Sequence, residues 1–233
     1  MIKKIIVLFA MLCIPIAAYA EENYEQKLIN EQTIQNRIDN VGVKLLNANK
    51  IPRRIIFVYN EAEKKSKLKL DTTMTSRQVI MFDNAYKSIE NDDELAAFLA
   101  REIVLAAKSF DREFAGGLNT LQIKAAPKKY EIIADKLAVN FMVKAGYDPI
   151  GLITYLQKTA PQRRFDKFSN RNLTSKRLAI IYEYIYTKYP YYLANNKYFE
   201  NEHYQNFLLT SVNNRKMLQQ KIKNGSKEEL HYE

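Results

Sequence analysis

Cysteine and histidine are almost missing from this chain of 233 residues. The single cysteine, Cys13, lies in an apolar N-terminal segment that we expect to be removed, so the mature chain has neither disulfides nor thiolate metal sites. The two histidines, His203 and His231, are 28 residues apart, which is too far for both to serve as ligands on one helical face. A zinc site of the usual cysteine or histidine type is therefore excluded.

The first residues, MIKKIIVLFAMLCIPIAAYA, are typical of a secretory signal peptide. Two lysines form its positive end, an apolar run covers residues 5–17, and residues 18–20 are a small-x-small cleavage site. The apolar run is shorter than the roughly 20 residues that a membrane-spanning helix needs. We therefore expect a signal peptide over residues 1–20 and export to the periplasm or to the outside of the cell.

Positive charge is abundant but has no focus along the chain. The formal net charge is +10, and +8 once Lys3 and Lys4 are removed with the signal peptide. Lysines and arginines are mixed with acids, apart from short clusters such as EKKSKLK. A nucleic-acid-binding protein would show a focused basic stripe or a recognition motif, and we find neither. We therefore expect no nucleic-acid partner. Weak peripheral contact with an anionic membrane surface stays open as an alternative.

The spacing of apolar residues predicts a mostly helical α+β protein. Helical periodicity covers residues 23–49, and RRIIFVYN at 53–60 is typical of a buried strand. The alternating stretch at 67–82 favours two further short strands, and therefore a small β-sheet or hairpin. A deeply buried helix follows, for which Asn91 and Glu94 form a capping-box pattern.

Glycine and proline mark the limits of the later helices. Gly146 is expected to follow the end of one helix, Asp148-Pro149 to begin the next, and Pro190 to end another. The helical ranges are about 128–145, from 148 onward, 175–189 and, weakly, 198–222. We divide the mature chain into a domain over residues 21–190 and a helical or disordered extension over 191–233, with a disordered tail from 223.

The helix that starts near Asn91 has the pattern of a zinc-protease helix without its ligands. In such a helix His-Glu-x-x-His places two imidazoles on one face, and the glutamate activates the metal-bound water. Here the same window reads Arg101-Glu102-Ile103-Val104-Leu105. Arginine has no lone pair to give a metal, and leucine has no ligand atom. We therefore expect no metal cofactor.

Four segments in order resemble the family-48 metallopeptidases, the HtpX- and BepA-like zinc metalloendopeptidases. NDDELAAFLAREI resembles the family's active-site helix, YEIIADKLAVNFMVKAGYDP its second helix, RRIIFVYN the strand before them, and RNLTSKRLAIIYEYIYTKYP a later His-Pro-x-x-x-x-Arg segment with its helix. Together they cover roughly residues 30–190. The resemblance implies a zincin-like α+β fold, with a small sheet or hairpin ahead of a buried helix of the active-site type. In the family this fold carries zinc.

The resemblance also assigns roles to positions of this chain. Glu102 falls at the general-base position, and Glu131 at the third zinc ligand. Asp135 falls at a supporting carboxylate, and Arg177 at the arginine of the later segment. The family's histidine positions are taken by Arg101 and Leu105 in the helix and by Arg171, followed by Asn172, in the later segment.

Loss of the metal from such a core would leave Glu131 as an uncompensated buried charge, which costs about 3–5 kcal/mol. We expect arginine to compensate it. Arg101, Arg171 or both are predicted to occupy the former metal position and to bond Glu131, in a bidentate geometry if the guanidinium plane permits. By the same reasoning Asp135 is expected to pair with arginine.

The favoured interpretation is an exported, non-catalytic relative of these proteases. It would bind a peptide, a misfolded envelope protein or an active protease relative through the old cleft. Two alternatives stay open: an active metalloendopeptidase with an atypical site, in which Glu102 keeps its role, and a module that binds anionic surfaces through its basic face. Whether the protein is an enzyme is therefore left to experiment.

Overall fold

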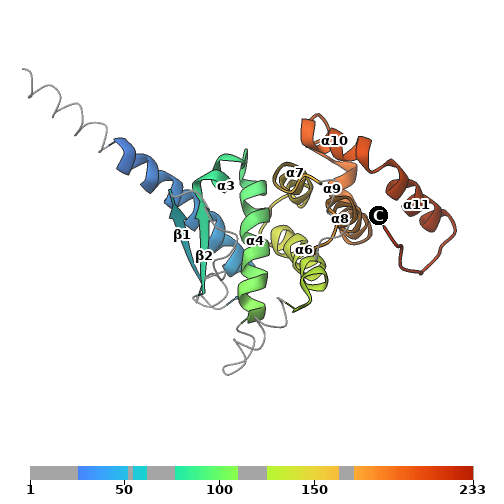
Figure 1. Ribbon diagram of the computed structural model, residues 1–233, viewed down its shortest axis with the longest axis horizontal. Helices are drawn as coiled ribbons and strands as arrows, with labels where there is room; N and C mark the ends of the chain where they lie inside the picture. Colours follow the sequence, from blue (N-terminus) through green and yellow to red (C-terminus); the bar gives the residue numbers. More distant parts are fainter. Residues whose placement is uncertain (1–25, 52–54, 62–76, 110–124, 163–170, 233) are drawn as a thin grey trace, which may run out of the picture.

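The computed structural model describes residues 26–51, 55–61, 77–109, 125–162 and 171–232. The expected signal peptide and the expected strand before residue 77 lie outside these ranges. Within them the chain is mostly helical with one small sheet, as a coarse α+β class predicts. Figure 1 shows the sheet, a long N-terminal helix and α3 on one side of α4, and α6 to α11 on the other side.

The sheet consists of two strands, β1 (Ile56–Asn60) and β2 (Gln78–Phe82). The strands are parallel, with Ile56 opposite Gln78. Of the expected small sheet or hairpin, a small sheet is present, and its parallel strands need a crossover connection. The expected turn between two strands within residues 67–82 lies outside the described residues. The apolar side chains of Val79 and Met81 alternate into the core, which is why this stretch forms a half-buried strand.

A side chain of the N-terminal helix covers the outer edge of β1. This helix spans residues 26–48 in the described part of the chain. The Gln35 amide donates to the carbonyl of Phe57 at 3.0 Å and accepts the backbone N–H of Tyr59 at 2.7 Å. The helix lies very close to the strand, since a Cβ placed on Gly42 would come within 2.4 Å of the Phe57 ring. The edge of β1 is thus satisfied without a further strand.

Helix α4 (Asp92–Ser109) is the central element and follows the short α3 (Asp83–Lys87). Its apolar residues are buried on nearly every side, as its sequence predicts. The side chain of Asn91 accepts the backbone N–H of Glu94 at 3.1 Å, which is one half of the expected capping box. The Glu94 carboxylate accepts the backbone N–H of Glu90 instead of that of Asn91, so the other half is shifted by one residue.

Helices α6 (Pro127–Lys144) and α7 (Ile150–Thr159) pack against α4 and are joined by a tight turn. Gly146 has φ +74°, and Tyr147 donates its N–H to the carbonyl of Met142. This is the Schellman ending that the glycine predicts. The Asp148 side chain accepts the N–H of Ile150 at 2.9 Å and so caps α7, although the regular helix begins one residue later than expected.

The remaining helices are α8 (Thr174–Lys188), α9 (Pro190–Ala194), α10 (Glu202–Thr210) and α11 (Val212–Lys223). Pro190 ends α8 as expected and also begins α9. Ser211 divides the weak helical pattern into α10 and α11. Tyr198, Tyr204 and Phe207 belong to the same hydrophobic core as α4 and α7, so residues after 190 contribute to that core.

The expectation of a disordered tail is wrong for the described residues after 223. Tyr232 is only 5% exposed. Its hydroxyl donates to the Glu183 carboxylate on α8 at 2.9 Å, and Lys221 donates to the same carboxylate at 2.8 Å. A single buried contact therefore fixes a polar tail whose composition alone favours disorder. None of the described helices combines the length and the apolarity needed to cross a membrane.

Candidate functional site

Three of the residues singled out in the sequence meet in one buried cluster: Arg101 on α4, Asp135 on α6 and Arg177 on α8. Asp135 is fully buried. Arg177 binds it in a bidentate geometry, with Nε donating to Oδ2 and Nη2 to Oδ1, each at 2.8 Å. Arg101 donates its Nε–H to Oδ1 at 2.7 Å. Two guanidinium groups thus share one carboxylate, and the cluster joins three helices.

The charge of Arg101 is kept by its neighbours. Burial lowers the pKa of this guanidinium, but the negative charges of Asp135 and Glu102 raise it by more than burial lowers it. The pKa of Arg101 therefore lies above its usual value. Arg101 is thus a fixed cation on the face of α4 where the resemblance to metallopeptidases places a first histidine ligand.

Glu131 lies one turn before Asp135 on α6 and has different partners. It accepts two hydrogen bonds from Asn172 through Oε2, one from the backbone N–H at 2.9 Å and one from the side-chain amide at 3.1 Å. The Arg171 guanidinium lies 3.5 Å from Oε1. The Arg171 side chain is 75% exposed, so this ion pair is largely solvated and weak compared with the buried cluster.

The expected compensation is therefore confirmed in part. Arg171 does lie beside Glu131, and Asp135 does pair with arginine. Of the two arginines expected at Glu131, Arg101 pairs instead with Asp135, which is deeper in the core. Asn172 was noted only as a replacement for a family proline. Its hydrogen bonds to Glu131 were missed, since a polar residue after an arginine gives no signal of its partner.

The other two positions of the zinc-protease window lie on the same helix as Arg101. Glu102 and Leu105 are both partly buried on α4. Glu102 is near enough to Arg101 to raise the pKa of the guanidinium. In the geometry described, the carboxylate acts as a counter-charge to an arginine.

The donor set does not fit zinc. Both oxygens of Asp135 accept N–H groups from guanidiniums, and Glu131 is engaged by Asn172 and Arg171. Zinc binding would require a carboxylate to exchange these partners for a dication beside two fixed positive charges. Among the described residues, no group of three or more His, Cys, Asp or Glu side chains is placed to hold a metal ion.

A second polar cluster, which the sequence did not reveal, lies at the start of α4. Glu94 is fully buried and accepts hydrogen bonds from the Thr154 hydroxyl at 2.7 Å and from Lys158 Nζ at 2.6 Å. Lys158 also lies 2.9 Å from Glu90. The partners are about sixty residues apart in the sequence, so only the packing of α7 on α4 brings them together.

Asp93 joins the start of α4 to α7 and to the segment before α10. Its carboxylate accepts the N–H of Asp148 at 2.9 Å and the hydroxyl of Tyr198 at 2.7 Å, and it lies 2.5 Å from Lys197 Nζ. Burial and, to a smaller degree, the charge of Asp93 raise the pKa of Asp148 to about 6, although its bond from Ile150 acts in the opposite direction. These contacts are structural, since the Asp93 carboxylate joins α4 to the backbone N–H of Asp148 and to the hydroxyl of Tyr198.

Comparison with known proteins identifies no relative of this chain. No protein-family model matches the chain, and neither a curated protein nor a solved structure matches it. Function must therefore be argued from the residues and their contacts.

Proposed function

We propose that this protein is an exported, non-catalytic relative of the family-48 metallopeptidases, with a zincin-like core that binds polypeptide. The observation that carries the proposal is the buried Arg101–Asp135–Arg177 cluster. It places the cation of Arg101 at a position where the resemblance would require a metal ligand, and Asp135 and Arg177 hold that cation in place. Hydrolysis by a metal-bound water has no support in this donor set, whereas binding needs none of the missing histidines.

The sheet supports a mode of binding. The carbonyl of Arg77 accepts the N–H of Ile56, so alternate backbone groups of β2 face β1 and the N–H of Ile80 faces the opposite edge. Gln35 already covers the outer edge of β1. In the described part of the chain, β2 pairs with no strand other than β1. An extended peptide, from a misfolded envelope protein or from an active protease relative, is proposed to add to this edge of β2.

The first experiment separates binding from catalysis. Purified mature protein is analysed for bound metal and incubated with fluorescein-labelled casein, whose cleavage and anisotropy are both recorded. The proposal predicts a rise in anisotropy with casein intact. Stoichiometric zinc, together with chelator-sensitive cleavage that a Glu102→Gln variant loses, would establish an active metalloendopeptidase instead.

A second experiment tests the edge of β2. Ile80→Pro removes the N–H that faces away from β1, and proline is tolerated on edge strands, so the fold should survive. Casein binding is expected to weaken at least tenfold, while the matched Ile80→Val variant keeps the N–H and should bind like the parent. Circular dichroism checks that both variants are folded. Equal binding by a folded Ile80→Pro variant would place the peptide elsewhere.

A further inference from the structure

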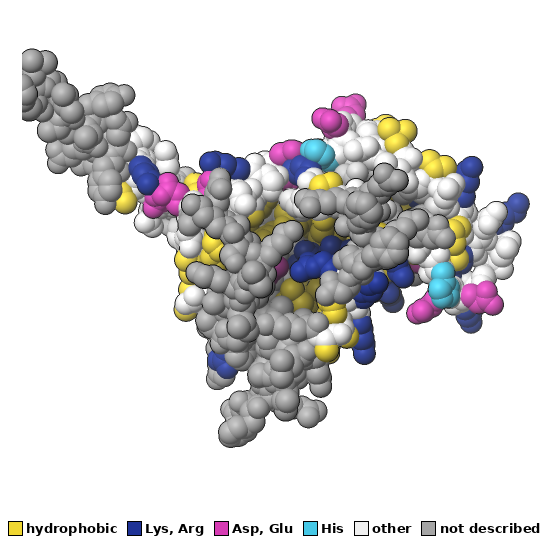
Figure 2. Space-filling model, viewed as in Figure 1, with side chains coloured by type: hydrophobic (Ala, Val, Ile, Leu, Met, Phe, Trp, Pro, Cys, Tyr) yellow, Lys and Arg dark blue, Asp and Glu magenta, His cyan; other side chains and the backbone are white. Residues whose placement is uncertain are grey.

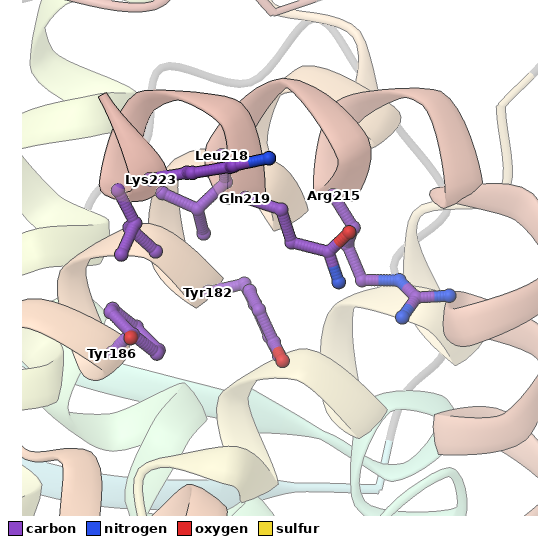
Figure 3. A pocket seen from close by; sticks show the side chains of 7 residues that line it. Tyr182, Tyr186, Arg215, Leu218, Gln219 and Lys223 are labelled. Carbon is purple, nitrogen blue, oxygen red and sulfur yellow. The ribbon is translucent and has the colours of Figure 1, made fainter. Parts of the chain in front are cut away.

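A groove between α8 and α11 lies apart from the arginine cluster and has the lining of a ligand site. Its cavity measures about 350 Å³. It is lined by the aromatic side chains of Tyr182 and Tyr186, the aliphatic side chains of Leu218 and Ile222, and the polar ends of Arg215, Gln219 and Lys223. Figure 3 shows the two tyrosines facing α11, with Arg215 toward the Tyr182 end and Lys223 toward the Tyr186 end.

The apolar floor follows from helical spacing. Tyr182 and Tyr186 are four residues apart on α8, and Leu218 and Ile222 are four residues apart on α11, so each pair presents one face to the groove. Tyr186 and Ile222 are still 41% and 42% exposed, although they flank each other across the cavity. This apolar surface is therefore incompletely covered by the chain itself.

The rim of the groove is cationic. Helix α11 carries four cations, including Lys216 and Lys223, and no acid. Arg215 is held in place, because Nε donates to the Ser211 hydroxyl at 3.2 Å and Nη2 to the carbonyl of Leu208 at 2.8 Å. These bonds use two of the five N–H groups of the guanidinium. The nearest acid on α8, Glu183, is already engaged by Lys221 and Tyr232.

A second hollow, lined by long side chains that end in polar groups, adjoins the groove along α11. It is lined by Lys216, Gln219, Gln220 and Lys223, and shares two of these residues with the groove. Two ammonium groups and two amides thus lie at helical spacing on one face of α11, next to the apolar floor. Figure 2 shows Lys and Arg side chains close to hydrophobic ones at the end of the molecule that holds α11.

We propose that the groove between α8 and α11 binds an acylated anion, with the chain on the tyrosine and aliphatic floor and the carboxylate or phosphate at the lysines of α11. The size supports a slender ligand. Ligand sites usually measure about 300–1,000 Å³, so this cavity is near the lower limit. Two turns of a helix about 10 Å across fill roughly 850 Å³, which is more than twice the space available. The ligand is either a free fatty acid or the anionic lipid of a bilayer.

Calorimetric titration of the full mature chain with sodium dodecanoate, below its micellar concentration, tests the free amphiphile. Saturable binding at one site is expected, and dodecanol, which lacks the anion, should bind at least tenfold more weakly. Ile222→Asp places an acid on the exposed rim and should weaken dodecanoate binding at least tenfold. Lys223→Glu should do the same, whereas Lys129→Glu makes the same charge change on α6 and should bind like the parent.

Co-sedimentation with phosphatidylglycerol vesicles, compared with phosphatidylcholine vesicles, tests the bilayer source. Vesicle binding that Ile222→Asp abolishes and Lys129→Glu does not would support the groove with a lipid as its ligand. Vesicle binding that both variants reduce equally would reflect net charge and would overturn the proposal. So would an absence of binding to both dodecanoate and vesicles, or binding of an acidic peptide in the groove without binding of dodecanoate.

Discussion

Removal of the charge of Asp135 is the sharpest test of the buried cluster. Asp135→Asn keeps the size of the side chain and one acceptor oxygen, but it removes the carboxylate that two guanidiniums share and leaves only Glu102 as a counter-ion near them. Three N–H groups now bond this carboxylate at 2.7–2.8 Å with no solvent access. Breaking a buried pair in this way costs about 3–5 kcal/mol, a large part of the 5–15 kcal/mol that usually stabilises a domain.

Urea unfolding followed by far-UV circular dichroism measures this loss, since the chain has no tryptophan to report by fluorescence. Asp92→Asn is the matched control. Asp92 also accepts from an arginine, Arg37, at 2.8 Å, but its side chain is 57% exposed, so the loss should stay below about 1 kcal/mol. A triple variant, Arg101→Met, Asp135→Leu and Arg177→Met, should recover most of the loss, because it removes Asp135 together with both guanidiniums and leaves only the partly buried Glu102. If Asp135→Asn costs no more than Asp92→Asn, the cluster does not stabilise the core and the argument is refuted.

Three further predictions concern the start and the packing of α7 and the contact of the C-terminal tail with α8. The pKa of Asp148 is raised to about 6, so the folded state binds a proton more tightly than the unfolded chain, and stability should fall as pH rises from about 4 to 6. Asp148→Asn keeps the cap and should flatten this dependence of stability on pH. Urea unfolding at several pH values should show a gain in stability of about 1 kcal/mol at pH 7 for this variant. Gly151→Ala should cost about 1–3 kcal/mol in thermal unfolding, because its Cβ would lie 2.9 Å from the backbone carbon of Asp93, and an unchanged melting temperature would show that α7 can shift. Tyr232→Phe should cost about 1 kcal/mol and increase proteolysis of the tail, and equal proteolysis of the two proteins would contradict a fixed tail.

Local patterns predicted the helices well, because their signals are short in range. The Schellman ending at Gly146, the cap at Asp148 and the stop at Pro190 each depend on a few neighbouring residues. The parallel pairing of β1 and β2 was not predicted, since strand direction depends on the path of the chain between the strands. The docking of Tyr232 on Glu183 was not predicted either, because its partner is 49 residues away.

The residues of the candidate site were predicted, but their partners only in part. The resemblance selected Arg101, Asp135 and Arg177, which the structure brings together. The sequence left Arg101, Arg171 or both as partners of Glu131, because a position pattern does not distinguish the depths of two carboxylates one turn apart. Asp135 has no solvent access, whereas Glu131 is reached by the exposed Arg171. A desolvated guanidinium gains most from the deeper carboxylate, since attraction between charges is stronger where water is excluded.

The balance of charges in the cluster gives Glu102 a role at a site that does not fit zinc. Arg101 and Arg177 bring two positive charges to Asp135, and one carboxylate balances only one of them. Glu102 supplies the second negative charge beside Arg101, and it raises the pKa of that guanidinium as a counter-ion should. The residue that looks most catalytic in the sequence is thus accounted for by electrostatic balance. A general base would need a water to activate, whereas a counter-ion needs only the arginine next to it.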